Sequence, residues 1–218
     1  MTNTWDDSYT AEMPPPWDLG RPQPAFVGLA ESGLLTGRVL DVGCGTGEQA
    51  LLAASHGAEA TGVDLSPTAI ERARAKAADR GLHVRFEVAD ALDPGQLAAS
   101  VGPLDPSAGT PDTSVGQLDP SVDVIIDSGV FHVFSDDDRP RYVASLASVL
   151  RPGGALYLMC FSDRQPGDFG PRRVRQDELR ASFSDGWAVQ SITADTFEIR
   201  PMGDTTRAQA WLAVFTRR

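Results

Sequence analysis

Residues 39–47 read Val39-Leu40-Asp41-Val42-Gly43-Cys44-Gly45-Thr46-Gly47, and this stretch decides the fold of the chain. Its apolar start predicts a short strand, and Gly43 and Gly45 permit the backbone angles of a tight turn. Because they lack a Cβ, they also let a ligand approach the main chain. Gly47 lets the next helix pack close to the sheet, and the free N–H groups at its start attract a polar ligand group.

A second strand, predicted over residues 58–63, ends at Asp64. A carboxylate at that place can accept hydrogen bonds from both hydroxyl groups of a ribose. Strand, turn, helix, strand and acid together predict that a nucleoside-containing cofactor lies across the switch point of a parallel sheet. The alternative is a packing turn followed by an Asp64 that caps a helix.

The spacing of the glycines bears on which cofactor is bound. Dinucleotide-binding folds favour G-x-G-x-x-G, where the helix N-terminus holds a pyrophosphate. Here the third glycine comes one residue earlier, and Asp41 precedes the turn. A carboxylate beside the loop would repel a pyrophosphate and attract an ammonium group.

Strands and helices continue to alternate as far as residue 183, which predicts a parallel sheet covered on both faces. We expect helices over residues 22–32, 47–56, 67–80, 137–150 and 176–183, and strands over 39–42, 58–63, 83–88, 122–126, 155–161, 187–192 and 209–216. The last two strands have no helix between them, so their link forms a hairpin and one of them runs antiparallel. The prediction is an α/β, Rossmann-like, seven-stranded and mostly parallel sheet.

Two segments stand outside this alternation. Residues 1–24 are rich in proline, so we expect an extended or loosely ordered lid over the site, with residues 25–218 as the single domain. Residues 101–121 hold two similar heptads, Val101-Gly-Pro-Leu-Asp-Pro-Ser and Val115-Gly-Gln-Leu-Asp-Pro-Ser. We interpret this stretch as a duplicated, mobile surface loop.

Composition narrows the classes of partner. The formal net charge of -11 argues against nucleic acid, because such a surface repels phosphates. The cysteines and histidines are scattered without metal-ligand spacing, so no metal is expected. Apolar runs are too short for a membrane span, and the first residues carry no signal pattern. We therefore expect a soluble, cytoplasmic protein that binds small molecules and has no membrane partner; its oligomeric state is not predicted.

The residues quoted above resemble a known family. The stretch Leu40–Gly47 is similar to the first motif of class I S-adenosylmethionine-dependent methyltransferases. Three further stretches resemble the acidic second-strand motif, the end of the third strand and the turn before the fifth strand of that family: Val63–Ser66, Val88–Ala91 and Leu150–Gly154. The four motifs stand in the family's order and cover roughly residues 36–162.

This resemblance implies a role for each cofactor-binding residue. Gly43, Cys44 and Gly45 would face the methionine part of S-adenosylmethionine, with Asp41 near its ammonium group, directly or through water. Asp64 would bind the ribose. The remaining expected contacts are Leu65 on the adenine face, Asp90 and Ala91 on the adenine edge, Asp127 at the end of the fourth strand, and Trp17 in the lid.

Other stretches resemble a small-molecule branch of the family, which includes thiopurine, thiol and heterocyclic-toxin methyltransferases. They are Pro16–Pro24, Asp127–His132, Cys160–Asp163 and Gly170–Arg173. The expected reaction is therefore methylation of an O, S or N atom of a small aromatic or heterocyclic molecule. Two alternatives stay open: a sensor that binds the cofactor without catalysis, and an NAD-dependent oxidoreductase.

Three residues are candidates for a catalytic base. His132 follows the fourth strand and has a reference pKa suited to a general base, although it can equally shape the pocket. Asp127 and Asp163 are the other candidates for a catalytic base. We expect Trp17 and Phe131 in the pocket wall, and Arg172 either attracting an anionic substrate or covering a solvated loop.

Overall fold

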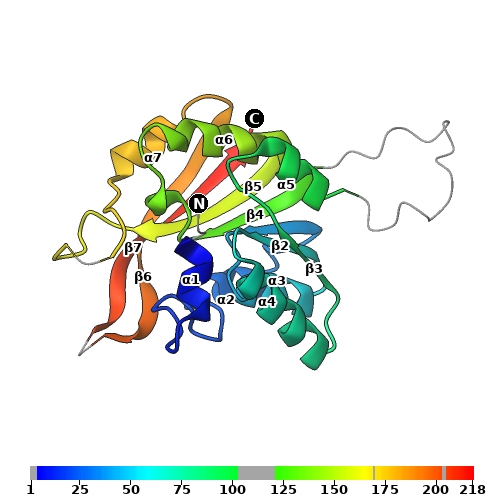
Figure 1. Ribbon diagram of the computed structural model, residues 1–218. Helices are drawn as coiled ribbons and strands as arrows, with labels where there is room; N and C mark the ends of the chain where they lie inside the picture. Colours follow the sequence, from blue (N-terminus) through cyan, green and yellow to red (C-terminus); the bar gives the residue numbers. More distant parts are fainter. Residues whose placement is uncertain (1–3, 103–120, 169, 203–204) are drawn as a thin grey trace, which may run out of the picture.

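The computed structural model describes residues 4–102, 121–168, 170–202 and 205–218 (Figure 1). Its helices are α1 (Thr4–Thr10), α2 (Pro24–Glu31), α3 (Glu48–Ser55), α4 (Pro67–Asp79), α5 (Pro94–Ser100), the 3-10 turn η1 (Phe131–Val133), α6 (Asp138–Val149) and α7 (Gln176–Ser182). Its strands are β1 (Arg38–Val42), β2 (Glu59–Asp64), β3 (Val84–Val88), β4 (Val122–Ser128), β5 (Leu150–Phe161), β6 (Trp187–Met202) and β7 (Thr205–Arg217).

The strands form one seven-stranded sheet in the order β3-β2-β1-β4-β5-β7-β6. Neighbouring strands from β3 to β5 are parallel, and β7 is antiparallel to both of its neighbours. The predicted mostly parallel sheet with one antiparallel strand near the C-terminus is confirmed. The order reverses between β1 and β4, so β1 and β4 border the switch point at which such sheets bind ligands.

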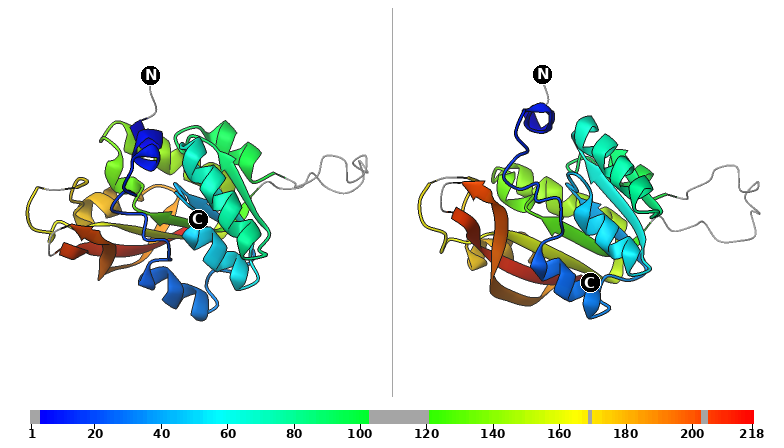
Figure 2. Two further views of the ribbon diagram at one scale, coloured as in Figure 1. Left: turned by 60° about the horizontal axis from the view of Figure 1, so that its bottom comes forward. Right: turned by 90° about the horizontal axis from the view of Figure 1, so that it is seen from below.

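Helices cover both faces of the sheet, as Figures 1 and 2 show. Phe26, Leu51 and Ile70 bring α2, α3 and α4 into one buried apolar cluster. Leu97, Tyr142 and Leu179 bring α5, α6 and α7 into the other. Because β1 and β4 are buried between the two clusters, their ends are held rigidly, which positions the residues that follow them.

Several elements differ from the sequence-based expectation. Residues 4–10 form helix α1, so the expectation of an extended or loosely ordered N-terminal stretch is wrong for these residues. Helix α5 was not predicted, although Asp93 caps it by accepting from the backbone N–H of Gly95 and Gln96, and Pro94 opens it. The last two strands extend much further toward each other than expected.

Most of the expected mobile loop, residues 103–120, lies outside the described residues. The residues at its two ends, among them Val101 and Ser121, are described. Arg38 donates a 2.6 Å hydrogen bond to the carbonyl of Ser121 and another hydrogen bond to the carbonyl of Val101. One side chain on β1 therefore holds both ends of this segment. In the described part of the chain, no helix is long and apolar enough to cross a membrane.

Candidate functional site

A cavity of about 1300 Å³ opens where the parallel strands end, with residues that close or follow β1, β2, β3, β4 and β5 in its wall. One part, the glycine end, is lined by Gly43, Cys44, Gly45, Asp64, Leu65, Asp90 and Ala91. The other part, the aromatic end, is lined by Ser128, Gly129, His132, Phe134, Phe161 and Phe197. The volume exceeds the roughly 300–1,000 Å³ of a pocket for one small ligand, so two ligands can lie in it together.

The glycine turn has the conformation that its sequence predicts. Gly43 and Gly45 have φ angles of 63° and 53°, in the left-handed region that favours glycine. A Cβ on Gly43 would lie 2.2 Å from a methyl carbon of Val130, and one on Gly45 would lie 2.7 Å from the hydroxyl of Tyr9. The turn therefore depends on glycine both for its backbone angles and for the close approach of its neighbours.

Asp64 supports the turn from the end of β2. Its carboxylate accepts hydrogen bonds from the backbone N–H of Gly45 at 2.8 Å and of Ser66 at 2.9 Å. Burial raises its pKa, and these two hydrogen bonds partly oppose that rise. A carboxylate oxygen accepts more than one hydrogen bond, so Asp64 retains capacity for the two hydroxyl groups of a ribose in the cavity that it lines.

Asp41 lies below the turn and does not line the cavity. One of its oxygens, Oδ2, accepts from the backbone N–H of Ala50 at 3.0 Å, whereas the buried Oδ1 has no hydrogen-bond partner among the described residues. Burial, Asp64 and Asp127 raise the pKa of Asp41 well above its usual value. A positively charged group near the turn would favour its ionised form, which is the chemistry expected opposite an ammonium group.

The adenine-side candidates come together as expected. Leu65, Asp90 and Ala91 all line the glycine end, and Leu65 leaves 40% of its surface exposed there. The Asp90 carboxylate accepts from the backbone N–H of Leu92 at 2.9 Å. The turn after β3 is thereby held with Asp90 and Ala91 beside the cavity.

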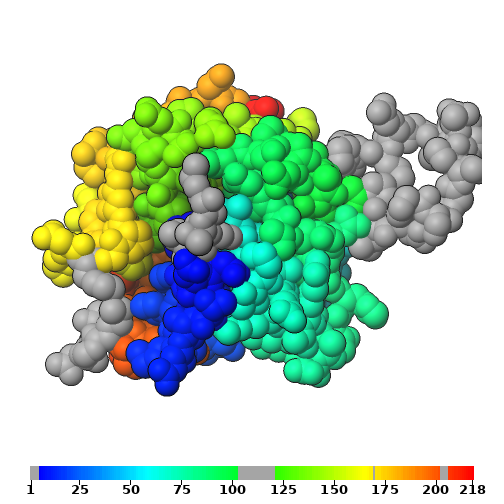
Figure 3. All heavy atoms as spheres, viewed as in Figure 1, coloured from blue at the N-terminus to red at the C-terminus, as the bar shows by residue number. Residues whose placement is uncertain are grey.

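The N-terminal segment (residues 4–24) lies between α4 and the β6–β7 hairpin (Figure 3), and several of its residues line the cavity. Trp5, Tyr9 and Trp17 all contribute to the wall. The indole N–H of Trp17 donates to the Tyr9 hydroxyl at 3.0 Å, and the two tryptophan rings meet edge to face at 5.9 Å. Tyr9 is a site residue that the sequence analysis did not identify, since only the helix α1 directs it at Gly45.

Polar contacts hold this segment on its two sides. On the α4 side, Asp6 accepts from the Ser66 hydroxyl at 2.6 Å and from the Thr68 backbone N–H at 2.9 Å. On the β6 side, the Gln23 amide makes two 2.9 Å hydrogen bonds with the backbone of Glu198. The segment is therefore attached at both ends.

The aromatic end is built around three rings from different elements. His132 from η1 meets Phe161 from β5 edge to face at 5.1 Å and lies 6.1 Å from Phe197 of β6. The two phenylalanine rings lie 5.7 Å apart. Sequence reasoning did not select Phe161 and Phe197 individually, because only the pairing of β5, β7 and β6 brings them to His132.

The hydrogen bonding of His132 bears on its expected role as a base. Its Nδ1 accepts a 2.9 Å hydrogen bond from the backbone N–H of Phe161. Burial, together with the positive charges of Arg139 and Arg173, lowers the pKa of His132 to about 3. His132 is thus in the predicted pocket as a neutral ring, and its geometry favours a pocket-shaping role over that of a general base.

Three other candidates lie outside the cavity wall. Phe131 is fully buried and packs against Tyr142 and Phe183, so its expected place in the pocket wall is wrong. Asp127 accepts hydrogen bonds from the backbone N–H of Val130 at 2.7 Å and of Phe131, and from the Tyr142 hydroxyl at 2.9 Å. With its oxygens turned into the core, Asp127 shapes the turn and does not face a ligand.

Asp163, the remaining candidate base, is exposed and accepts a 3.2 Å hydrogen bond from the Trp211 indole. It is not part of the cavity wall. This position favours a role in holding the end of β5 against β7.

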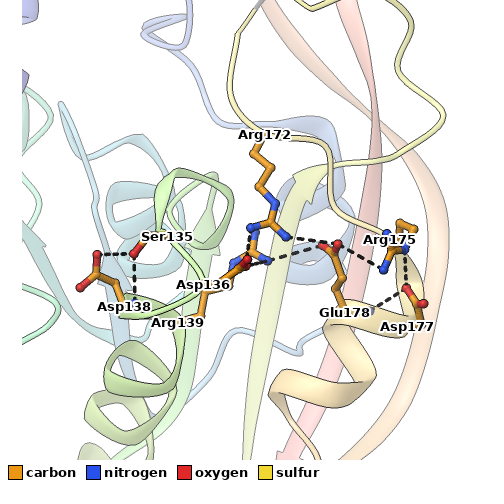
Figure 4. A network of polar contacts seen from close by, with 8 residues as sticks. All are labelled: Ser135, Asp136, Asp138, Arg139, Arg172, Arg175, Asp177 and Glu178. Atoms are coloured by element: carbon orange, nitrogen blue, oxygen red, sulfur yellow. Dashed lines mark hydrogen bonds and ion pairs between the residues drawn. The ribbon is translucent and has the colours of Figure 1, made fainter.

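Arg172 lines the cavity, but carboxylates neutralise its charge (Figure 4). It pairs with Asp136 and, at 3.2 Å, with Glu178 of α7. Glu178 also pairs with Arg139 and Arg175, each at 3.5 Å. This network ties the loop before α7 to the start of α6, so Arg172 is a structural link at the edge of the aromatic end.

Comparisons with known proteins agree with this geometry. Residues 40–156 match the family model described as a methyltransferase domain. The chain is 35% identical over 202 residues to 2-heptyl-1-hydroxyquinolin-4(1H)-one methyltransferase of Mycobacteroides abscessus, with 88% of this chain and 80% of that protein covered. It is 30% identical over 209 residues to probable thiol methyltransferase 2 of Arabidopsis thaliana, with coverages of 95% and 83%.

One solved structure is similar to this chain over its whole length. A structure solved for the conversion of a disulfide bond into a thioacetal group during echinomycin biosynthesis is 36% identical, with a TM-score of 0.79. The similarity covers 100% of this chain and 93% of that one. The seven-stranded sheet, the glycine turn and the N-terminal segment therefore lie within the aligned region.

Proposed function

This chain belongs to the class I S-adenosylmethionine-dependent methyltransferases, and we propose that its acceptor is a small aromatic or heterocyclic molecule methylated on an O, S or N atom. The observation that carries the proposal is the three-ring aromatic end formed by His132, Phe161 and Phe197. Aromatic rings pack on a planar acceptor in offset or edge-to-face contacts. The hydroxyquinolone named for one relative is such a heterocycle, and the thiol named for the other offers a sulfur atom for methylation.

The glycine end fits the methyl donor in three respects. The left-handed glycines leave the main chain open, and the Asp64 carboxylate suits a pair of hydroxyl groups. The Asp41 Oδ1, which has no hydrogen-bond partner in the described part of the chain, suits a nearby positive charge. When bound, S-adenosylmethionine supplies a methyl group on a positively charged sulfur. In this proposal Asp64 holds the ribose, Asp90 and Ala91 hold the adenine edge, and Asp41 compensates the ammonium charge.

The protein contributes mainly by holding the acceptor. Positioning two reactants at near-attack distance can lower a barrier by roughly 7–11 kcal/mol. In the proposal, Phe161 and Phe197 orient the plane of the acceptor, and the N-terminal segment acts as a lid. Such a lid excludes water and strengthens local electrostatic interactions. Trp17 in the lid contacts the cofactor or the acceptor.

Incubation with isotope-labelled S-adenosylmethionine and a panel of thiols, phenols and N-heterocycles tests the proposal, with labelled product detected by mass spectrometry. We expect product from at least one planar acceptor. Titration calorimetry with S-adenosylhomocysteine and with NADH provides the companion measurement. Binding of S-adenosylhomocysteine without product from any acceptor would favour the sensor alternative, and tight binding of NADH alone would favour the oxidoreductase.

A variant of the aromatic end tests whether this part of the cavity holds the acceptor. Phe197→Ala removes one ring, and we expect a raised KM for the acceptor with the affinity for S-adenosylhomocysteine unchanged. Leu34→Ala is a matched control, because Leu34 is exposed and lies outside the cavity wall. An equal response of the two variants would contradict the assignment of the aromatic end to the acceptor.

A further inference from the structure

The protonation of His132 is fixed by its surroundings. A backbone N–H can only donate, so the Phe161 N–H requires a lone pair on Nδ1 of His132. In the neutral ring the proton is then on Nε2, and the Gly129 backbone beside the ring favours a proton there. Neither nitrogen is therefore free to take a proton from an acceptor.

The other ionisable groups of the cavity wall have partners within the protein or are neutral. The carboxylates accept from the protein: Asp18 from the Thr46 hydroxyl, Asp64 from two backbone N–H groups, Asp90 from Leu92, Glu48 from Lys76 and Arg80, and Glu198 from Arg21 and Arg207. The cationic partners of Glu48 and Glu198 lower the pKa of both carboxyl groups. Burial raises the pKa of the Tyr9 hydroxyl and of the Cys44 thiol, so both are neutral near pH 7. Among the described residues of the wall, each carboxylate thus has a partner that favours its ionised form and weakens it as a base.

Positive charge lies behind the aromatic end. The Arg173 guanidinium lies 5.6 Å from the centre of the Phe161 ring, and that of Arg139 lies 4.5 Å from the Phe131 ring. The hydrogen bonds of Arg173 go to backbone carbonyls, among them those of Pro171 at 2.6 Å and Gly167 at 2.8 Å. Arg139 pairs with Asp136 at 3.6 Å and with Glu178 at 3.5 Å, so its charge is compensated. Arg173 forms no ion pair among the described residues, and its charge therefore favours an anion at the aromatic end.

We propose that the acceptor reacts as a preformed anion, so that the substrates are thiols and heteroaromatic hydroxyl compounds acidic enough to ionise near neutral pH. The acceptor loses its proton to water before transfer. A lone pair of the anion then forms the bond to the methyl carbon, the carbon–sulfur bond breaks, and its electron pair neutralises the sulfonium. This inference rests on the proposed function and specifies its substrate class.

The test is the pH dependence of kcat/KM for a series of acceptors. Para-substituted thiophenols and substituted hydroxyquinolines provide rings of similar size whose own pKa values span several units. We expect the midpoint of each profile to move in step with the pKa of the acceptor, in the native enzyme and in His132→Gln alike. The glutamine keeps an oxygen that can accept from the Phe161 N–H.

Arg173→Gln tests whether the positive charge of Arg173 favours an anionic acceptor. We expect kcat/KM for an ionised thiophenol to fall roughly tenfold, the scale of one charge-assisted interaction. Arg164→Gln is the matched control, since Arg164 stacks on Trp211 at 5.7 Å outside the cavity wall, and we expect no change.

The outcomes separate the two proposals. One midpoint shared by all acceptors and lost in His132→Gln would assign a base to the protein and overturn the inference alone. Equal effects of the Arg173 and Arg164 substitutions would also contradict it. An absence of turnover with every acceptor, despite binding of S-adenosylhomocysteine, would refute the proposed function and this inference with it.

Discussion

His132→Gln should change how the stability of the protein depends on pH. The folded state holds the pKa of His132 near 3, whereas the unfolded chain has a value close to 6.5. Between these values the unfolded chain binds more protons, so the free energy of unfolding falls as the pH decreases below 6.5. Glutamine does not titrate, so this contribution disappears in the variant.

The two pKa values set the size of the effect. At 1.36 kcal/mol per pH unit, neutral His132 costs the native protein about 0.8 kcal/mol at pH 6 and about 2 kcal/mol at pH 5, relative to pH 8. The pKa of Asp127 is raised to about 6 by burial, and it acts in the opposite direction. Because Asp127 is present in both proteins, its contribution cancels in their difference.

Urea unfolding of both proteins at pH 5, 6, 7 and 8 measures this difference. We expect the free energy of unfolding of the native protein minus that of the variant to be constant above pH 7 and to be lower by about 2 kcal/mol at pH 5. A difference that stays constant over the whole range would refute the neutral, buried His132 described above. So would a native protein that gains stability over the variant in acid.

The cofactor site and the fold give three further predictions. Asp64→Asn should weaken S-adenosylhomocysteine binding about tenfold or more in titration calorimetry, whereas the exposed control Asp79→Asn should not; equal affinities would remove Asp64 from the site. Binding of S-adenosylhomocysteine should release a proton from Asp41. The binding enthalpy in titration calorimetry should then depend on the ionisation enthalpy of the buffer, and Asp41→Asn should abolish that dependence. A dependence that persists in the variant would point to another group. Glu48→Gln leaves Lys76 on α4 and Arg80 at its C-cap without their carboxylate partner. Urea unfolding should therefore show that the free energy of unfolding falls by about 1–3 kcal/mol, and an unchanged midpoint would contradict this.

The sheet was predictable from the sequence because local patterns specify its elements. Glycine permits the left-handed angles of the turn after β1, and the apolar run Val124–Ile126 in β4 predicts burial on both faces. Asp64 ends β2, and Asp90 and Ala91 lie in the turn after β3, so their shared place follows from the parallel pairing of these strands.

The aromatic end was less predictable because it depends on long-range contacts. Phe161 and Phe197 meet only through β7, which pairs with both β5 and β6. Reasoning from position along the chain also placed Asp127 and Phe131 wrongly in the cavity wall. Hydrogen bonds within the turn direct Asp127 into the core, and the tight η1 turn places Phe131 against Tyr142 while the next side chain lines the cavity.

Arg38 bears on how the length of this chain can change during evolution. By holding the carbonyls of Val101 and Ser121, it keeps the points where residues 103–120 leave and rejoin the fold together. By the general scaling of loop-closure entropy, doubling the length of chain between two fixed points costs only about 0.6 kcal/mol, so copying a heptad there would hardly affect folding. The two related heptads at residues 101–107 and 115–121 are what a duplication between these two points would leave. The same position offers a place to insert a reporter or an affinity tag at a distance from the glycine turn.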